Sequence, residues 1–274
     1  MIVASRRPPT RPDQVLWEPD GGFGDQALEQ LNGIDAVVHL AGENVGERWT
    51  TEKKKRIYES RILGTRALVS SLEKLRQRPK VLVSASGVIY GSRGDEMLTE
   101  NSSIGDTFLA KLTVDWEKEA LRAKDLGVRV VLPRIGPVLT KEGGALGKML
   151  MPFSFGLGGI VGSGRQWMGW ISLEDLVRIF EFAIENESLD GAYNAASPNP
   201  VTNEEFTKTL GRVLHRPTVM PLPEFAVRLM FGEMGEELLL GSYRLYPERL
   251  LEAGFEFEYP DLEPALRHAL SAGN

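Results

Sequence analysis

The sequence predicts an α/β fold in which a doubly wound parallel sheet carries helices on both faces and a small helical cap follows at the C-terminal end. Short apolar runs alternate with long segments of helical periodicity, which is the pattern of βαβ units. The chain has 274 residues, of which 42% are hydrophobic and 26% charged, so it can bury a large core around such a sheet.

The predicted strands of the first half are short and apolar. They cover residues 2–4, 36–40, 81–83 and 128–132. Two helices, each with one apolar face, connect the last three strands and are expected to cover the sheet. The first helix presents Ile57, Tyr58, Ile62, Thr65, Leu68, Val69, Leu72 and Leu75 on that face, and the second presents Leu109, Leu112, Trp116, Ala120 and Ala123.

The second half begins with a glycine-rich stretch, residues 156–164, which we interpret as turns and a short strand bordering a site. A helix over residues 173–185 has Ser172 as its expected N-cap, and a short strand follows near residues 192–195.

Thr202 and Glu205 form a capping box that starts a further helix. Beyond it, prolines and glycines divide the tail into short helices. We therefore expect residues 1–220 to form the sheet domain and residues 221–274 to form the cap.

Composition excludes several classes of protein. A formal net charge of -6 argues against a nucleic-acid binder, because phosphate backbones require a basic surface. Cysteine is absent, so disulfides and thiolate chemistry are excluded, and we expect a cytoplasmic location. The three histidines are too scattered to predict a metal site, and no apolar stretch approaches the ~20 residues of a membrane span. A small molecule is the expected partner, and the oligomeric state stays open.

The most informative strand leads into Ser86. Residues 81–91 read as a buried strand followed by a turn of small residues, and ligands of open parallel sheets bind at the carboxyl ends of the strands. Ser86 could therefore present its hydroxyl to a substrate carbonyl or alcohol. The alternative is that the serines of this segment only satisfy backbone groups in the turn.

Several motifs are spread over the whole chain: Ser5 to Pro8, Leu40 to Asn44, Arg48-Trp49, Ser84 to Gly91, Asp115 to Glu117, Gly143 to Leu146, Gly156 to Gly164, Trp170-Ile171 and Leu250 to Phe255. Together they resemble the extended or atypical short-chain dehydrogenases/reductases. Within that family they resemble the nucleotide-sugar-epimerase-like subgroup often called epimerase family protein or, loosely, cell-division-inhibitor-like. The resemblance implies a Rossmann-like, NAD(P)-binding sheet domain with a C-terminal cap.

The resemblance also predicts an element that the sequence does not show. Members of this family begin with a strand and a glycine loop that binds the cofactor pyrophosphate, whereas Met1 falls where the second strand of the family starts. We expect either a shortened reading frame or a repaired sheet. The two strands that flank the missing one would then close up or leave backbone groups unpaired.

The resemblance implies NADP (NADPH) as the cofactor. Ser5 and Arg6 follow the first strand, where arginine accommodates a 2'-phosphate, although a solvated basic turn would also explain them. Leu40, Ala41 and Gly42 bring the backbone close to the cofactor ribose. Arg61, within an apolar helical stripe, could be compensated by a cofactor phosphate or could extend outward to solvent.

Catalysis in the family uses a serine, a tyrosine and a lysine, and only the serine is clear here. Ser86 is the candidate serine. Tyr90 is a candidate acid, although a structural role is usual for it, and Ser86 and Arg134 also border the nicotinamide end. Lys111 is the candidate lysine, which leaves Thr107 at the tyrosine position; a register set by Glu117 gives Leu109 and Thr113 instead. Lys111 could also pair with Asp115 on the helix surface.

The substrate side is predicted from Arg165, Gln166 and Trp170, which follow the glycine-rich stretch and suit a planar or anionic ligand. Glu43, in the segment from Leu40 to Asn44, is a further expected substrate contact. The tryptophans could instead anchor the cap. The resemblance supports an NADP-dependent oxidoreductase or epimerase of unknown substrate; the alternatives are a catalytically silent dinucleotide-binding sensor or division-related partner, and a chain that binds no dinucleotide.

Overall fold

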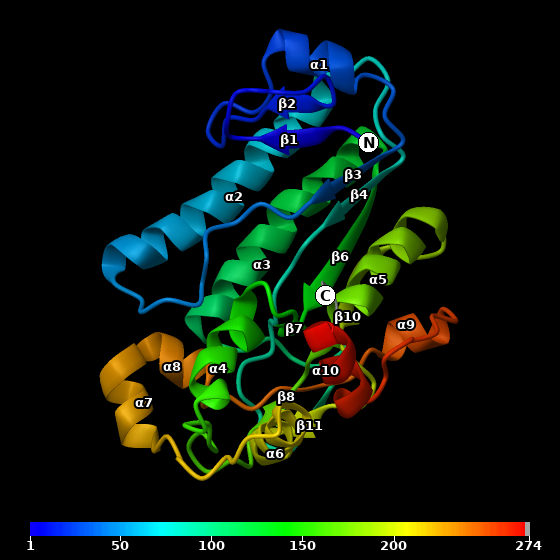
Figure 1. The fold of residues 1–274 in the computed structure, drawn as a ribbon. Helices are drawn as coiled ribbons and strands as arrows, with labels where there is room; N and C mark the ends of the chain where they lie inside the picture. Colours follow the sequence, from blue (N-terminus) through cyan, green and yellow to red (C-terminus); the bar gives the residue numbers. More distant parts are fainter. Residues whose placement is uncertain (272–274) are drawn as a thin grey trace.

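The structure, a computed structural model, describes residues 1–271 and is built on a four-stranded parallel sheet in the order β10-β6-β4-β3 (Figure 1). The strands are β3 (Ala36–His39), β4 (Val81–Ser84), β6 (Arg129–Ile135) and β10 (Gly191–Ala195). All four were predicted within a few residues. β6 extends beyond its predicted end because residues 131–135 pair with β10, and β10 begins one residue before its predicted start.

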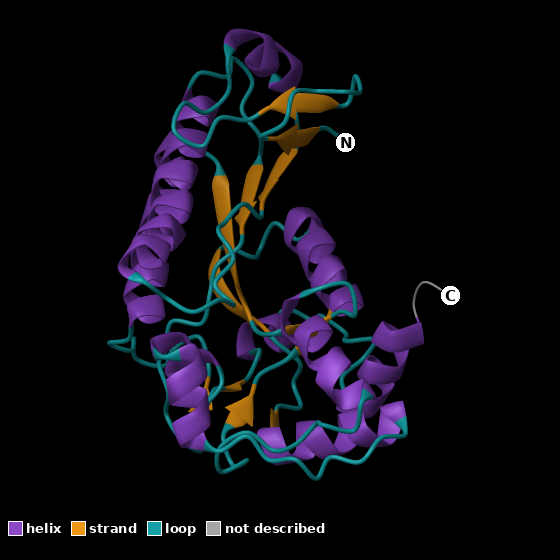
Figure 2. Ribbon diagram, turned by 60° about the vertical axis from the view of Figure 1, so that its left-hand side comes forward, coloured by secondary structure: helices purple, strands orange, loops and turns teal. Residues whose placement is uncertain are grey.

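Helices cover both faces of this sheet, as Figure 2 shows. α2 (Thr51–Glu73), α3 (Phe108–Leu121) and a 3-10 turn (Arg122–Leu126) lie on one face. Leu68 and Leu72 of α2 share an apolar cluster with Leu82 of β4. α5 (Leu173–Glu185) lies on the other face, where Ile179 packs with Val81 and Val83. The alternation of core residues along β4 therefore assigns one set to each helical layer.

Most of the predicted helical stripes face the core, with one exception. Ile57, Ile62 and Leu68 are buried, whereas Tyr58 is 38% exposed and donates a hydrogen bond to Asp115 Oδ2 at 2.9 Å. Tyr58 stands at the edge of the stripe, and its hydroxyl is better satisfied at the surface than in an apolar layer.

The first two strands stand apart from the main sheet. β1 (Val3–Ser5) pairs in parallel with β2 (Gln14–Leu16), and neither pairs with β3. α1 (Asp25–Leu31) follows them. β3 is consequently an edge strand, and Val38 is 42% exposed. β1 and β3 are the strands expected to flank the missing one. They have not closed up on each other, so the ladder between them is interrupted.

Short paired strands and two helices form the end of the molecule below the main sheet in Figure 1. β7 (Val138–Leu139) pairs with β9 (Ile171–Ser172), and β8 (Trp167–Met168) pairs with β11 (Val201–Thr202). α4 (Gly144–Ser154) and α6 (Asn203–Leu214) pack beside them. Ser172 and Thr202 accept the predicted capping hydrogen bonds from Asp175 N and Glu205 N.

The C-terminal segment runs as a strap across this end of the molecule. α7 (Glu224–Phe231) and α8 (Glu233–Leu238) lie on one side, and α9 (Glu248–Glu252) and α10 (Leu262–Ser271) on the other (Figure 1). Between them β12 (Arg244–Leu245) pairs with β5 (Met97–Leu98), while α9 packs on β10 and α10 on α6. The last three residues of the expected cap, 272–274, lie outside the described residues.

No helix within residues 1–271 combines the length and the apolar character that crossing a bilayer requires.

Candidate active site and cofactor-binding edge

Ser86 lies just beyond β4, at the carboxyl end of the sheet. Ala85 N donates to His39 O at 2.9 Å and Ser86 N donates to Pro133 O at 2.8 Å, so the backbone continues the ladder toward β3 and β6. Ser86 also forms a parallel bridge with Arg134. Its side chain points toward the α3 layer, which Leu82, four residues earlier on the same strand face, also contacts.

The hydroxyl of Ser86 is held by a buried ion pair. It donates to Glu117 Oε1 at 2.6 Å. Arg134 donates to both oxygens of the same carboxylate, from Nε at 2.8 Å and from Nη2 at 2.9 Å. The side chains of Arg134 and Glu117 are only 11% and 10% exposed. A bidentate pair of this kind fixes the carboxylate and thereby the direction of the Ser86 hydroxyl.

Tyr90 continues this network and has no exposed surface. Its hydroxyl accepts from Arg134 Nη1 at 3.0 Å and donates to Asn194 Oδ1 at 2.7 Å. The amide of Asn194 is oriented by two donations, to Leu98 O and Tyr246 O. Burial raises the pKa of Tyr90. The hydroxyl proton of Tyr90 is therefore used in a hydrogen bond within the protein. Tyr90 holds the network together and is not placed to give a proton to a substrate.

Lys111 lies on the exposed side of α3, away from Ser86. It makes no salt bridge within residues 1–271, and the expected pair with Asp115 is not formed because that carboxylate accepts from Tyr58. The α3 side chains that reach the serine segment are Glu117 and Thr113; a Cβ at Gly87 would lie 3.0 Å from Thr113 Oγ1. The helix therefore brings no tyrosine or lysine to Ser86.

Arg61 and Gly42 form a second polar position, at the end of β3. The guanidinium of Arg61 lies against Gly42, where an added Cβ would come within 3.1 Å of Cζ. Nη1 donates to Glu43 O and Ile57 O, and Cζ stands 5.1 Å from the Trp116 ring centroid. Burial lowers the pKa of Arg61 to about 10, so it remains charged at neutral pH. Within residues 1–271 it has no carboxylate partner.

Leu40 and Ala41, which lead to this position, are exposed, with Leu40 at 62%. Glu43 follows, and its carboxylate is occupied: Lys53 Nζ donates to it at 2.7 Å and Arg56 Nε lies 3.7 Å away. Hydrogen bonding from Lys53 lowers the pKa of Glu43. Glu43 thus fastens the loop after β3 to the start of α2, and the predicted substrate contact would compete with that ion pair.

Ser5 and Arg6 end β1, on the small separate sheet. Ser5 Oγ accepts from Arg7 N at 3.1 Å, which forms a local turn. Arg6 is exposed and makes no salt bridge in the described part of the chain. The structure therefore leaves the guanidinium of Arg6 available to a ligand.

The predicted substrate residues of the glycine-rich segment separate into exposed and buried positions. Arg165 is exposed. Gln166 donates from its amide to Val161 O and Leu239 O and is 8% exposed. Trp170 has no exposed surface, packs with Leu139 and Phe206, and donates to Asn199 O at 3.2 Å. Gln166 and Trp170 therefore hold segments of the protein together in this structure and line no open surface.

Sequence reasoning missed the two residues that organise the network, Glu117 and Asn194. A signal existed for Glu117, since it falls between Trp116 and Ala120 on the buried side of α3 and needs a cationic partner there. Arg134 in an otherwise apolar strand is that partner. Asn194 carried no such signal, because a single asparagine in a short strand does not identify its three partners.

Two family models match the chain. The model described as NAD dependent epimerase/dehydratase family matches residues 22–196. A domain of unknown function, DUF1731, matches residues 222–269, the segment that forms the C-terminal strap.

Among curated proteins, an epimerase family protein of Mycobacterium leprae is 42% identical over 265 residues, covering 96% of this chain and 85% of that protein. The epimerase family protein YfhF of Bacillus subtilis is 39% identical and covers 94% of this chain and 84% of that protein. Both similarities extend through the sheet domain and the strap.

Among solved structures, human epimerase family protein SDR39U1 with NADPH superposes with a TM-score of 0.89 at 35% identity, covering 98% of this chain and 90% of that one. A nucleoside-diphosphate sugar epimerase from Corynebacterium glutamicum gives a TM-score of 0.79 at 36% identity, covering 98% of this chain and 52% of that one. The sheet with its helical layers, the matched family models and these relatives agree that the chain belongs to the NAD dependent epimerase/dehydratase family and has the Rossmann-like fold of the short-chain dehydrogenases/reductases.

Proposed function

We propose that the chain binds NADP(H) at the carboxyl edge of its sheet and acts as an oxidoreductase or epimerase-like enzyme on a small molecule. The observation that carries the proposal is Arg61, a half-buried cation that rests on Gly42 without a carboxylate partner in the described residues. A phosphate or ribose oxygen would satisfy its remaining donors. The relative solved with NADPH supports the choice of cofactor.

The residues of the chain fit such a cofactor at three positions. The absence of a side chain at Gly42 makes room for the guanidinium of Arg61 at the end of β3, Arg61 supplies a positive charge there, and the exposed Arg6 suits a 2'-phosphate. Bound NADPH would supply hydride at its nicotinamide. Ser86 would accept a hydrogen bond from a substrate hydroxyl there, because its own O–H donates to Glu117, which Arg134 holds in place.

Titration of the purified protein with NADPH and with NADH, followed by nicotinamide fluorescence and by calorimetry, tests this proposal. We expect NADPH to bind more tightly, and Arg6→Ala to weaken NADPH binding by about tenfold while leaving NADH unchanged, because a charge-assisted contact is lost. Arg7→Ala, one residue further along, is the matched control. Failure of both dinucleotides to bind would remove the cofactor from the proposal.

A second function, cofactor binding without turnover in a sensor or a division-related partner, is favoured by a different observation. The hydroxyl of Ser86 already donates a hydrogen bond to Glu117. Tyr90 has no exposed surface, and Lys111 lies on the exposed side of α3, away from the serine. Consumption of NADPH in a substrate screen, abolished by Ser86→Ala, would favour the enzyme. Tight NADPH binding with no turnover, and with affinity unchanged by Ser86→Ala, would favour the sensor.

A further inference from the structure

The hydroxyl of Ser86 has a single hydrogen-bond partner within residues 1–271. It donates to Glu117 Oε1 at 2.6 Å. No histidine, lysine or tyrosine in that part of the chain is hydrogen-bonded to it, and Tyr90 reaches it only through Arg134 and Glu117. A proton that leaves Ser86 toward the protein therefore goes to Glu117.

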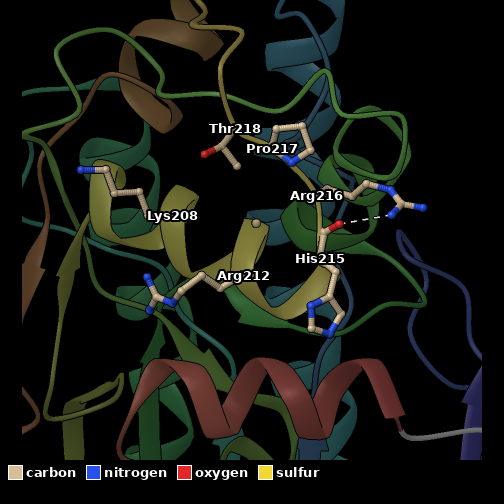
Figure 3. A pocket seen from close by; sticks show the side chains of 7 residues that line it. Lys208, Arg212, His215, Arg216, Pro217 and Thr218 are labelled. Atoms are coloured by element: carbon tan, nitrogen blue, oxygen red, sulfur yellow. Dashed lines mark hydrogen bonds between the residues drawn. The ribbon is translucent and has the colours of Figure 1, made fainter.

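The three histidines, which are the side chains that most often accept a proton near neutral pH, lie elsewhere. His39 Nε2 lies 3.1 Å from Thr65 Oγ1, and His268 belongs to α10. His215 lines a pocket at the end of α6 together with three basic side chains, as Figure 3 shows. None of the three histidines is hydrogen-bonded to Ser86, and a carboxylate takes that position.

Glu117 is also the only group next to Ser86 in the described residues that can take up a proton. Arg134 donates to both of its oxygens, from Nε at 2.8 Å and from Nη2 at 2.9 Å, and an arginine in a protein has no proton to accept. The pair fixes the carboxylate and leaves a lone pair of Oε1 directed at the serine. The separation of Ser86 Oγ and Glu117 Oε1 is that of a strong O–H···O⁻ bond, about 2.5–2.7 Å.

The close approach of strand and helix that this bond requires depends on Gly87. A Cβ added at Gly87 would lie 3.0 Å from Thr113 Oγ1, which is a tight contact. Thr113 stands one turn before Glu117 on the same face of α3. A side chain at residue 87 would therefore push the helix away from Ser86, and the glycine permits the short bond.

We propose that Ser86 and Glu117 form a proton relay for an alcohol substrate, or for the corresponding carbonyl in the reverse direction. The inference rests on the proposed function, in which a substrate hydroxyl donates to Ser86 Oγ. During oxidation the substrate O–H bond breaks, its electron pair forms the second C–O bond, and its proton forms a new O–H bond at Ser86 Oγ. The former Ser86 proton passes to Glu117 Oε1. The hydride of the carbinol carbon goes to the oxidised nicotinamide, and reduction reverses every transfer.

Carbon NMR of the protein labelled with ¹³C at its glutamate carboxyls examines the relay without any substrate. The signal of Glu117 is assigned by its absence in Glu117→Gln. Ser86→Ala should shift this signal, because the carboxylate loses a donor. Ser84→Ala is the matched control and should not shift it, since the buried hydroxyl of Ser84 has no partner in the described residues. An unshifted signal in Ser86→Ala would overturn the proposal.

Turnover of primary and secondary alcohols with NADP, and of the matching aldehydes and ketones with NADPH, tests the transfer itself. Glu117→Gln should lower kcat by about 10²–10³-fold with little change in KM, because the proton acceptor is lost. Glu117→Asp should recover part of the rate. Glu119→Gln, on the same helix and also paired with arginines, is the matched control and should keep the wild-type rate. Circular dichroism and NADPH binding of each variant report folding and the cofactor site.

Rates in mixtures of H₂O and D₂O separate a relay from a merely structural role of Glu117. The wild-type rate should fall along a curve as the fraction of D₂O rises, because two protons move in one step, whereas one moving proton gives a straight line. A straight line, or a wild-type kcat in Glu117→Gln, would overturn the relay and leave the proposed function standing. NADPH binding without turnover of any alcohol or carbonyl would overturn the relay together with the enzymatic part of that function.

Discussion

His39 illustrates how a single titratable group contributes to stability without taking part in chemistry. It ends β3, is 6% exposed, and its Nε2 lies 3.1 Å from Thr65 Oγ1, which also accepts from Trp116 Nε1. Burial lowers the pKa of His39 from 6.5 to about 4. The folded protein therefore keeps this imidazole neutral at a pH at which the unfolded chain protonates it.

The depressed pKa of His39 predicts an acid-sensitive contribution to stability. Its stabilising effect is complete above pH 6.5 and is lost as the pH falls toward 4, by about 3 kcal/mol in all, because the unfolded chain binds the proton more tightly. Urea unfolding of the wild type and of His39→Gln across this range measures it. The difference between the two should shrink as the pH falls; a difference independent of pH would contradict the assignment.

Arg134 contributes through its ion pair with Glu117. Arg134→Met leaves the Glu117 carboxylate buried without its cation, so we expect the free energy of unfolding to fall by about 3 kcal/mol. Urea denaturation measures the loss. Arg122→Met removes a surface ion pair with Glu119, in which the arginine is 50% exposed, and should cost less than about 1 kcal/mol. Equal losses in the two variants would show that burial of the pair has no special effect.

At the scale of elements, α3 depends on a residue far away in the sequence. Both oxygens of Glu237 in α8 accept hydrogen bonds from its first turn, from Phe108 N at 3.0 Å and Leu109 N at 3.2 Å. Thr107 also accepts from Ala110 N at 3.2 Å. Three backbone donors at the start of α3 are thus satisfied, and the negative charge of Glu237 lies where the helix dipole favours it.

This tertiary cap predicts a measurable cost for its removal. Glu237→Ala should lower the free energy of unfolding by about 1–2 kcal/mol, because two partly buried N–H groups lose their acceptors. Chemical denaturation checks it, and hydrogen exchange should show Phe108 and Leu109 losing protection first. Glu236→Ala, the exposed neighbour on α8, should change stability by no more than about 0.5 kcal/mol. A larger loss of stability in Glu236→Ala than in Glu237→Ala would show that the contact between α8 and α3 does not depend on Glu237.

At the scale of the whole molecule, cofactor binding should appear as added stability. If NADPH binds only the folded chain, a concentration one hundred times its Kd adds about 2.7 kcal/mol to the free energy of unfolding. Arg61→Met should remove most of this gain by weakening binding, which thermal unfolding with and without NADPH measures. Arg66→Met, an exposed arginine of the same helix paired with Glu119, should retain the gain.

The sequence allowed the sheet, its helical layers and the caps at Ser172 and Thr202 to be predicted, because their signals are local and periodic. The sequence left open whether β1 and β3 pair, because strand pairing depends on contacts between residues that are far apart in the chain. The site was predicted only in part. Ser86 was placed correctly at the sheet edge, but the hydrogen bonds that occupy it come from Glu117 and Arg134, on a separate helix and a separate strand.

The hydrogen bonds from α3 to Glu237 also bear on the order in which the protein folds. The donor and acceptor residues are 129 positions apart, so the start of α3 leaves the ribosome long before its acceptor is synthesised. The helix that carries Glu117 toward Ser86 is therefore completed only after the C-terminal strap has been made. Contacts of such long sequence separation slow folding, and until they form the nascent chain exposes an unfinished carboxyl edge of the sheet on which chaperones can act.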